Sequence, residues 1–165
     1  MESHAKLLGH PAHTLLIVFP LGLLGTATLF DIIYIFNESP RLAIASFYMQ
    51  VAGIVGGLVA AVPGWIDWSH IPSGTRAKRV GLVHGSGNVV VLLLFAVSVL
   101  FRWDEIEAPP TVSLVAAILG FALAGFTGWL GGELVDRLGV GVDHGAHLNA
   151  PSSLSGRPIS EGRAL

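Results

Sequence analysis

Four long runs of apolar residues alternate with short polar segments along the chain. Each run is long enough to cross the hydrocarbon core of a bilayer, which takes roughly 20 residues in a helix. The pattern predicts membrane-spanning helices over residues 12–36, 42–68, 80–102 and 111–135. Because the connections are short, neighbouring helices must run in opposite directions. We therefore expect an all-α, up-down-up-down four-helix bundle that is integral to a lipid bilayer.

The first and third runs carry ionisable residues at matching positions. His13 and Asp31 lie near the two ends of the first run, His84 and Arg102 near those of the third, and each pair is 18 residues apart. Eighteen residues make five helical turns, about 27 Å, so the members of each pair share one face of a helix. If the two helices lie side by side in parallel, the histidines meet at one membrane surface and Asp31 meets Arg102 at the other. The sequence leaves open whether the latter two form an ion pair or merely mark the ends of their spans.

Composition places the chain among integral membrane proteins. Of its residues 52% are hydrophobic and only 12% are charged, a balance too apolar for a soluble domain of this length. Seven of the nine basic residues lie in the two terminal segments and in the loop after the second run. The positive-inside rule then predicts that both termini are cytoplasmic and that the protein lies in the cell inner membrane. No basic stripe is present, so we expect no nucleic-acid partner.

The absence of cysteine excludes several kinds of redox site. Without thiolates the chain cannot form disulfides, thiolate zinc sites, cysteine-ligated iron–sulfur clusters or covalent c-type haem. Seven histidines remain, and under the predicted topology all of them fall on the cytoplasmic side. Only His10, His13 and His84 stand close enough to the start of a span to indicate a buried site.

One imidazole from each of two helices at equal depth is the arrangement that binds a b-type haem in a bundle. His13 (or His10) and His84 are the expected ligands, and Asn88 lies one turn deeper than His84. The basic residues of the neighbouring loop are candidate partners for the haem propionates, namely Arg76, Lys78 and Arg79. Glycines in the second and fourth runs would either clear space for a flat cofactor or, in the interpretation we favour, let the helices pack closely.

Two other interpretations of the histidines stay open. With Asp67 or Glu133, His13 and His84 would suit a zinc, iron or copper ion. Alternatively no cofactor binds, and the histidines hydrogen-bond to helix ends and to Asn88. The three interpretations imply in turn a redox-associated subunit, a metal-binding or metal-transporting protein, and a non-catalytic anchor or accessory subunit of a respiratory or photosynthetic complex. No catalytic set is recognisable, so we do not expect the chain to be an enzyme by itself.

Residues 143–165 form a tail of glycine, serine and proline without helical periodicity, distinct from the membrane domain of residues 1–142. Such composition is typical of disordered segments, and we expect a partner subunit of a redox complex to hold the tail. A sparse internal repeat is also present. The polar pairs of the first and third runs are offset by 71 residues, and Gly64-Trp65 has a counterpart in Gly128-Trp129. Two hairpins related by an axis along the membrane normal would produce such a repeat.

Several motifs together resemble a known family. They are the opening Gly9-His10-Pro11 with His13 and Phe19 to Gly22, the end of the second run from Gly64 to Trp68, His84 with Asn88, and the stretch from Gly128 to Val135 with Gly139 to Val142. In these the chain resembles the predicted bacterial membrane proteins grouped as domain of unknown function 2231. The resemblance implies a four-span fold and, because such domains often lie beside or are fused to Rieske-type redox modules, a role near electron transfer. The chain departs from this family in having Asp136 and Leu138 where members often carry a tyrosine and a histidine, which favours a structural role.

Overall fold

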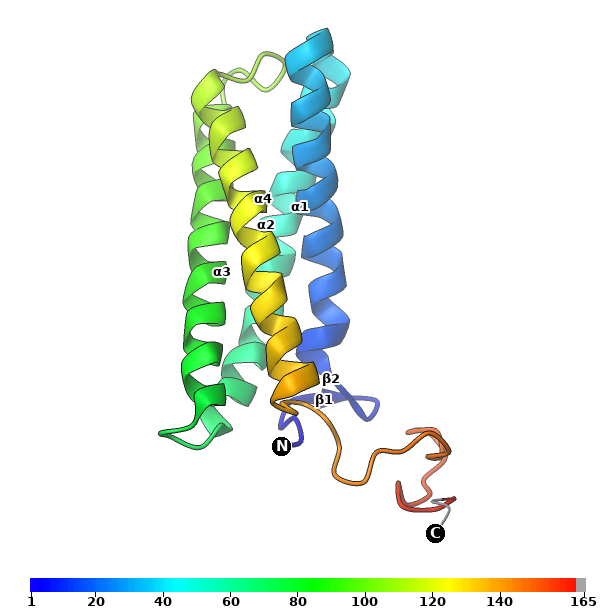
Figure 1. Ribbon diagram of the computed structural model, residues 1–165. Coiled ribbons are helices and arrows are strands. Elements are labelled where there is room, and N and C mark those ends of the chain that lie inside the picture. Colours follow the sequence, from blue (N-terminus) through cyan, green and yellow to red (C-terminus); the bar gives the residue numbers. More distant parts are fainter. Residues whose placement is uncertain (163–165) are drawn as a thin grey trace.

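The computed structural model describes residues 1–162 and contains four long helices that run up and down in turn (Figure 1). They are α1 (Ala12–Asn37), α2 (Pro40–His70), α3 (Arg76–Phe101) and α4 (Thr111–Gly132). All four are long and apolar enough to cross a membrane. Apart from a hairpin of two short strands, β1 (Lys6–Leu7) and β2 (His10–Pro11), the fold is helical. The predicted four-helix membrane bundle is confirmed.

The helix ends differ from the expected bounds where local capping acts beyond the apolar run. Pro40 opens α2 at a position where its missing N–H costs nothing. The third helix begins at Arg76, four residues before the start of its apolar run, because the Thr75 hydroxyl accepts a hydrogen bond from the backbone N–H of Lys78 at 3.1 Å. At the other end of the chain, α4 continues into a π-helical turn, η1 (Glu133–Arg137).

The bundle consists of two hairpins. α1 packs closely on α2, and α3 packs closely on α4. Contacts between the two hairpins are fewer, and they join α2 to α3 and α1 to α4. The helices α1 and α3 therefore occupy opposite corners of the bundle and run in the same direction (Figure 1). Apolar side chains from three helices meet in the middle of the core, namely Leu24, Val91, Phe95 and Ala117.

The two hairpins repeat one packing arrangement. A Cβ atom at Gly53 of α2 would lie 2.6 Å from the Leu24 side chain of α1, and one at Gly120 of α4 would lie 3.1 Å from Phe95 of α3. Leu24 and Phe95 are 71 residues apart and the glycines 67. These glycines serve close helix packing, as we favoured. In this register Gly64 corresponds to Gly131, so the expected pairing of Gly64-Trp65 with Gly128-Trp129 is displaced by three residues.

The lead and the tail lie at the same end of the bundle and hold each other (Figure 1). Lys6 in the lead forms an ion pair with Asp143, and the backbone N–H of His144 donates to Glu2 at 3.0 Å. Further along, the Ser153 hydroxyl donates to the carbonyl of Leu8 at 3.1 Å. Part of the tail is therefore held by the chain itself, and a partner subunit on it stays a prediction.

Candidate functional site

His13 and His84 lie next to each other across the bundle. His13 is in the first turn of α1 and His84 in the third turn of α3. Their ring centroids are 6.2 Å apart and the ring planes are nearly perpendicular, at 86°. The common register predicted from the 18-residue spacing therefore brings one imidazole from each hairpin to the same level of the bundle.

Each ring is fixed by the neighbouring helix of its own hairpin. Nδ1 of His13 lies 2.8 Å from the carbonyl oxygen of Ala60, and Nδ1 of His84 lies 2.8 Å from that of Thr127. A helical side chain covers the turn that precedes it, so the residue four positions later would normally shield such a carbonyl. Here that residue is Gly64 or Gly131, and an added Cβ would lie 2.8 Å from the His13 ring or 3.2 Å from the His84 ring.

These hydrogen bonds determine which nitrogen of each histidine is available. A carbonyl oxygen only accepts, so Nδ1 carries a hydrogen in both rings, and in the neutral form of each ring Nε2 is the nitrogen with a lone pair. Metal-binding histidines commonly have one ring N–H tied to a backbone carbonyl in this way. His13 and His84 are therefore the two side chains that would hold a metal ion or a haem iron at this level of the bundle.

Asn88 and Thr127 contact His84, and within residues 1–162 they have no counterpart around His13. The Asn88 amide donates to the carbonyl of His84 at 2.9 Å and approaches His84 Nε2 at 3.3 Å. Its oxygen accepts from the Thr127 hydroxyl at 3.0 Å. The backbone oxygen of the same threonine receives His84 Nδ1, so the three residues form a closed ring of contacts.

The remaining predicted site residues lie apart from the two rings. His10 is in β2 and its Nε2 is 3.4 Å from the Ser153 hydroxyl in the tail. Arg76 pairs with Glu133 at 2.7 Å on the surface, and Arg79 donates to the carbonyl of Gly74. Within residues 1–162 no group of three histidine, cysteine or acidic side chains is placed to hold a bare metal ion.

Asp67 anchors the N-terminal lead to the end of α2. This buried carboxylate accepts hydrogen bonds from the Ser3 hydroxyl, at 2.8 and 3.0 Å, and from the backbone N–H groups of His4 and Ala5, at 2.7 and 3.2 Å. Three donor groups compensate its charge without a metal. The structure therefore places Asp67 with the lead and not with His13 and His84.

Asp31 and Arg102 form an ion pair at the opposite end of the bundle from the histidines. The guanidinium of Arg102 donates to both carboxylate oxygens, at 3.0 and 2.8 Å, and both side chains are 0% exposed. Four buried side chains complete the network around them, namely Ser46, Gln50, Ser98 and Ser113. Of the two alternatives left open by the sequence, the structure contains the ion pair, in a bidentate form.

The residues that support these two sites were not predicted from the sequence. Thr127 orients His84, and Gln50 donates to Asp31 at 2.9 Å. A signal was present in the repeat, because the 67-residue offset relates Ala60 to Thr127 and also Ser46 to Ser113. The repeat is hard to recognise because equivalent residues are 71 positions apart in α1 and α3 but 67 positions apart in α2 and α4.

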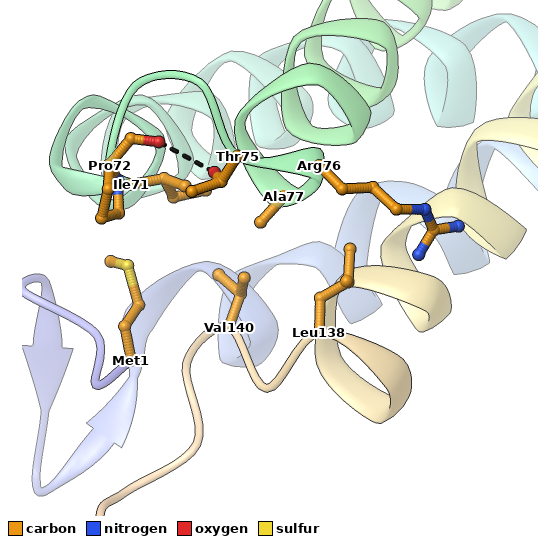
Figure 2. Close-up of a pocket in the computed structure, with 8 residues that line it drawn as sticks. All are labelled: Met1, Ile71, Pro72, Thr75, Arg76, Ala77, Leu138 and Val140. Atoms are coloured by element: carbon orange, nitrogen blue, oxygen red, sulfur yellow. Dashed lines mark hydrogen bonds between the residues drawn. The ribbon is translucent and has the colours of Figure 1, made fainter.

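Two cavities lie beyond the end of the bundle and not between the histidines. The first, of about 280 Å³, is formed by the N-terminus, the loop between α2 and α3 and the segment after η1 (Figure 2). It is mainly apolar, and the Arg76 side chain extends away from it. The second, of about 330 Å³, lies between the lead and the tail and includes His10. Neither is lined by His13 or His84, so a flat cofactor between the rings would have to enter the seam between the two hairpins.

A protein-family comparison agrees with this fold. The family described as predicted membrane protein (DUF2231) matches residues 9–144, which include β2, all four helices and the first residues of the tail. The chain belongs to the DUF2231 family. Both histidines and the Asp31–Arg102 pair lie within the part of the chain that matches DUF2231. Searches of curated proteins and of solved structures gave no match.

Proposed function

We propose that this DUF2231 protein is a small redox-associated subunit of the cell inner membrane, which holds a b-type haem between His13 and His84. The observation that carries the proposal is the pairing of the two rings. They come from opposite hairpins, they are 6.2 Å apart, and each has its Nδ1 tied to a backbone carbonyl. This leaves two Nε2 lone pairs as neutral ligands, the donors that haem iron accepts in a four-helix bundle.

The chain's own residues would orient and shield such a group. The carbonyls of Ala60 and Thr127 hold the imidazoles in one tautomer, and a group bound between the two rings would lie against both hairpins. When bound, the haem supplies one-electron transfer. Arg76 and Arg79, in the first turn of α3, stay the candidate partners for its propionates. By the positive-inside rule this end faces the cytoplasm.

A reduced-minus-oxidised absorption spectrum of the detergent-purified protein tests the proposal. We expect sharp α and Soret bands in the native protein, and their loss in both His13→Ala and His84→Ala. His10→Ala serves as a matched control, because His10 lies in the lead next to Ser153 and should leave the bands unchanged.

A featureless spectrum from protein purified out of its native membrane, with full occupancy ensured by added haem precursor, would refute the haem. Metal analysis of the same sample then separates a bare metal ion from no cofactor at all. Stoichiometric partner proteins in a sample without haem or metal would instead support an anchor or accessory subunit of a larger complex.

A further inference from the structure

The turn of the hairpin in the lead holds a leucine in an unfavourable backbone conformation. β1 and β2 pair with Leu7 opposite His10, and the two residues between them form the turn. These are Leu8 and Gly9, with φ of +52° and +83°, the positive values of a type I′ turn. Glycine and asparagine favour such angles, whereas leucine rarely adopts them. Turn chemistry therefore does not explain why a leucine stands at this position.

The side chains of Leu7 and Leu8 are exposed although the backbone that carries them is fixed. They are 53% and 69% exposed. The tail covers the turn from the side of Gly9, where an added Cβ would lie 2.7 Å from Cβ of Ser153. The Ser153 hydroxyl also donates to the carbonyl of Leu8 at 3.1 Å. A strained turn that presents two uncovered apolar side chains indicates a partner outside the chain.

The hairpin lies at the membrane surface because it leads directly into the first span. β2 ends at Pro11 and α1 begins at Ala12, whose backbone N–H donates to the carbonyl of Ala5 at 2.8 Å. This bond ties the open end of the hairpin to the start of the helix, so the turn is about 10 Å away at roughly 3.3 Å per strand residue. Figure 1 shows the hairpin extending sideways from the end of the bundle. The two leucines therefore lie beside the bundle, at the level where α1 enters the bilayer.

We infer that Leu7 and Leu8 insert into the interface of the bilayer that the bundle spans, and that the hairpin anchors the lead and the tail to the membrane surface. The exposed leucines continue the lipid-facing surface of α1, where Val18 and Phe19 are 67% and 66% exposed. Burial of the leucine side chains at the boundary between headgroups and acyl chains compensates the strained turn. This contact requires no haem or metal.

The contact is apolar and not electrostatic. Lys6 is the cationic residue next to the two leucines, and it is paired with Glu2 at 3.2 Å and also with Asp143. A lysine held by two carboxylates adds little attraction to anionic headgroups. The hairpin should therefore reach the same depth in zwitterionic and in anionic bilayers.

Quenching of a single fluorophore by spin-labelled lipid tests this inference in the full-length protein. The chain has no cysteine, so Leu7→Cys provides one site for an environment-sensitive nitrobenzoxadiazole probe. In phosphatidylcholine nanodiscs with a nitroxide near the headgroup end of the acyl chain, we expect this probe to be quenched more strongly than one at Ser160→Cys in the exposed tail. Its emission should be shifted to shorter wavelength, towards that of the lipid-facing reference Phe19→Cys. Added phosphatidylglycerol should change none of the three.

Variants of Leu8 separate insertion from any effect of the probe at residue 7. Leu8→Asn should lose the quenching, because its side chain is polar, and it should keep the turn, because asparagine accepts a positive φ. Leu8→Met keeps an apolar side chain and is the matched control, with quenching as in the native turn. Quenching no stronger than at Ser160→Cys, or quenching that is unchanged in Leu8→Asn, would overturn the inference. Quenching that appears only with phosphatidylglycerol would also overturn it, since charge would then make the contact.

Discussion

Two glycines determine whether the histidines can reach their backbone partners. A glycine within a helix costs about 1 kcal/mol relative to alanine, so Gly64 and Gly131 need a compensating reason. In both hairpins the glycine exposes the carbonyl one turn earlier, and a histidine from the adjacent helix donates to it at 2.8 Å. The same local device occurs twice, which indicates that ring orientation matters at this end of the bundle.

Gly64→Ala should separate stability from site geometry. The added methyl group would lie 2.8 Å from Nδ1 of His13 and push the ring away from Ala60, while the helix itself gains propensity. We expect the affinity for the proposed haem to fall about tenfold or more, as for the loss of one buried hydrogen bond, with the unfolding temperature in detergent unchanged or raised. Haem titration and thermal unfolding of the same samples give both values.

Gly85→Ala is the matched control, because open space surrounds a Cβ at that position one residue after His84. It should raise helix stability by the same amount and leave haem affinity unchanged. Equal haem affinity in Gly64→Ala and Gly85→Ala would show that the contact between His13 and Ala60 does not orient a ligand.

Individual residues were predictable from the sequence to different degrees. Helix geometry predicts that His13 lies opposite His84 and that Asp31 lies opposite Arg102. The structure brings the members of each of these two pairs together. The role of Asp67 does not follow, because its partners are backbone N–H groups of a lead that has no periodic pattern. Nor does that of Gln50, since a polar residue within an apolar run does not reveal which neighbour it faces.

At the scale of the elements, hydropathy predicted each helix but not where it begins. Residues 76–79 are polar and lie outside the third apolar run, yet they are helical because Thr75 caps them. The lead forms a two-stranded hairpin through backbone pairing alone, with Lys6 opposite Pro11 and Leu7 opposite His10. Capping and backbone pairing do not depend on the hydrophobic pattern. That pattern therefore predicts neither the early start of α3 nor the strand hairpin in the lead.

Thr75→Ala should shorten α3 at its N-terminus. The variant loses the hydroxyl that accepts from Lys78 at 3.1 Å, and removal of such a cap costs about 1 kcal/mol. Faster hydrogen exchange of the N–H groups of Lys78 and Arg79, with unchanged exchange in the middle of the helix, is the expected result. Thr75→Ser keeps the oxygen and should restore the native exchange rates; slow exchange in both variants would mean that the cap contributes nothing.

The contact between the lead and the tail should open in acid. Hydrogen bonds from the backbone N–H of His144, and then from Lys6, hold the pKa of Glu2 below its ordinary value of 4.5. A carboxylate with a lowered pKa stabilises the contact fully above pH 4.5, and that stabilisation is lost as the pH falls through the lowered value. Asp143 raises the pKa of Lys6 above 10.5, so the Lys6 contribution is present below pH 10.5 and is lost only above it.

Hydrogen exchange at the backbone N–H of His144 measures this opening. We expect protection at neutral pH and its loss below pH 4.5, together with a loss in concentrated salt because the groups are exposed. In Glu2→Gln the exchange, corrected for its intrinsic pH dependence, should no longer change across this acid range. Protection that persists in acid in the native protein would mean that Glu2 does not hold the tail.

On the scale of the whole molecule, polar side chains of the two hairpins meet at both ends of the bundle. The 71-residue repeat puts Asp31 and Arg102 at equivalent positions, so two identical charges there would face each other and repel. Opposite charges instead join α1 to α3 across the bundle, at a depth where no water is available to solvate either group. The fold was predictable because these constraints are severe: few sequences can bury an arginine in a membrane without supplying its carboxylate.

The ion pair should behave as one unit when the bundle unfolds. Among the residues that the structure describes, Arg102→Met leaves the buried Asp31 carboxylate with Gln50 as its one close donor. Asp31→Leu leaves the guanidinium with serine hydroxyls as its only partners in the same part of the chain. Each change should therefore cost about 3–5 kcal/mol. The double variant removes both charges and should cost less than either single change. Unfolding in mixed detergent and denaturant micelles measures all three, with Glu38→Gln, an exposed residue at the same end, as the neutral control. If the two single costs simply add, the hairpins are held by the apolar core around Phe95, and the charges at the far end do not join them.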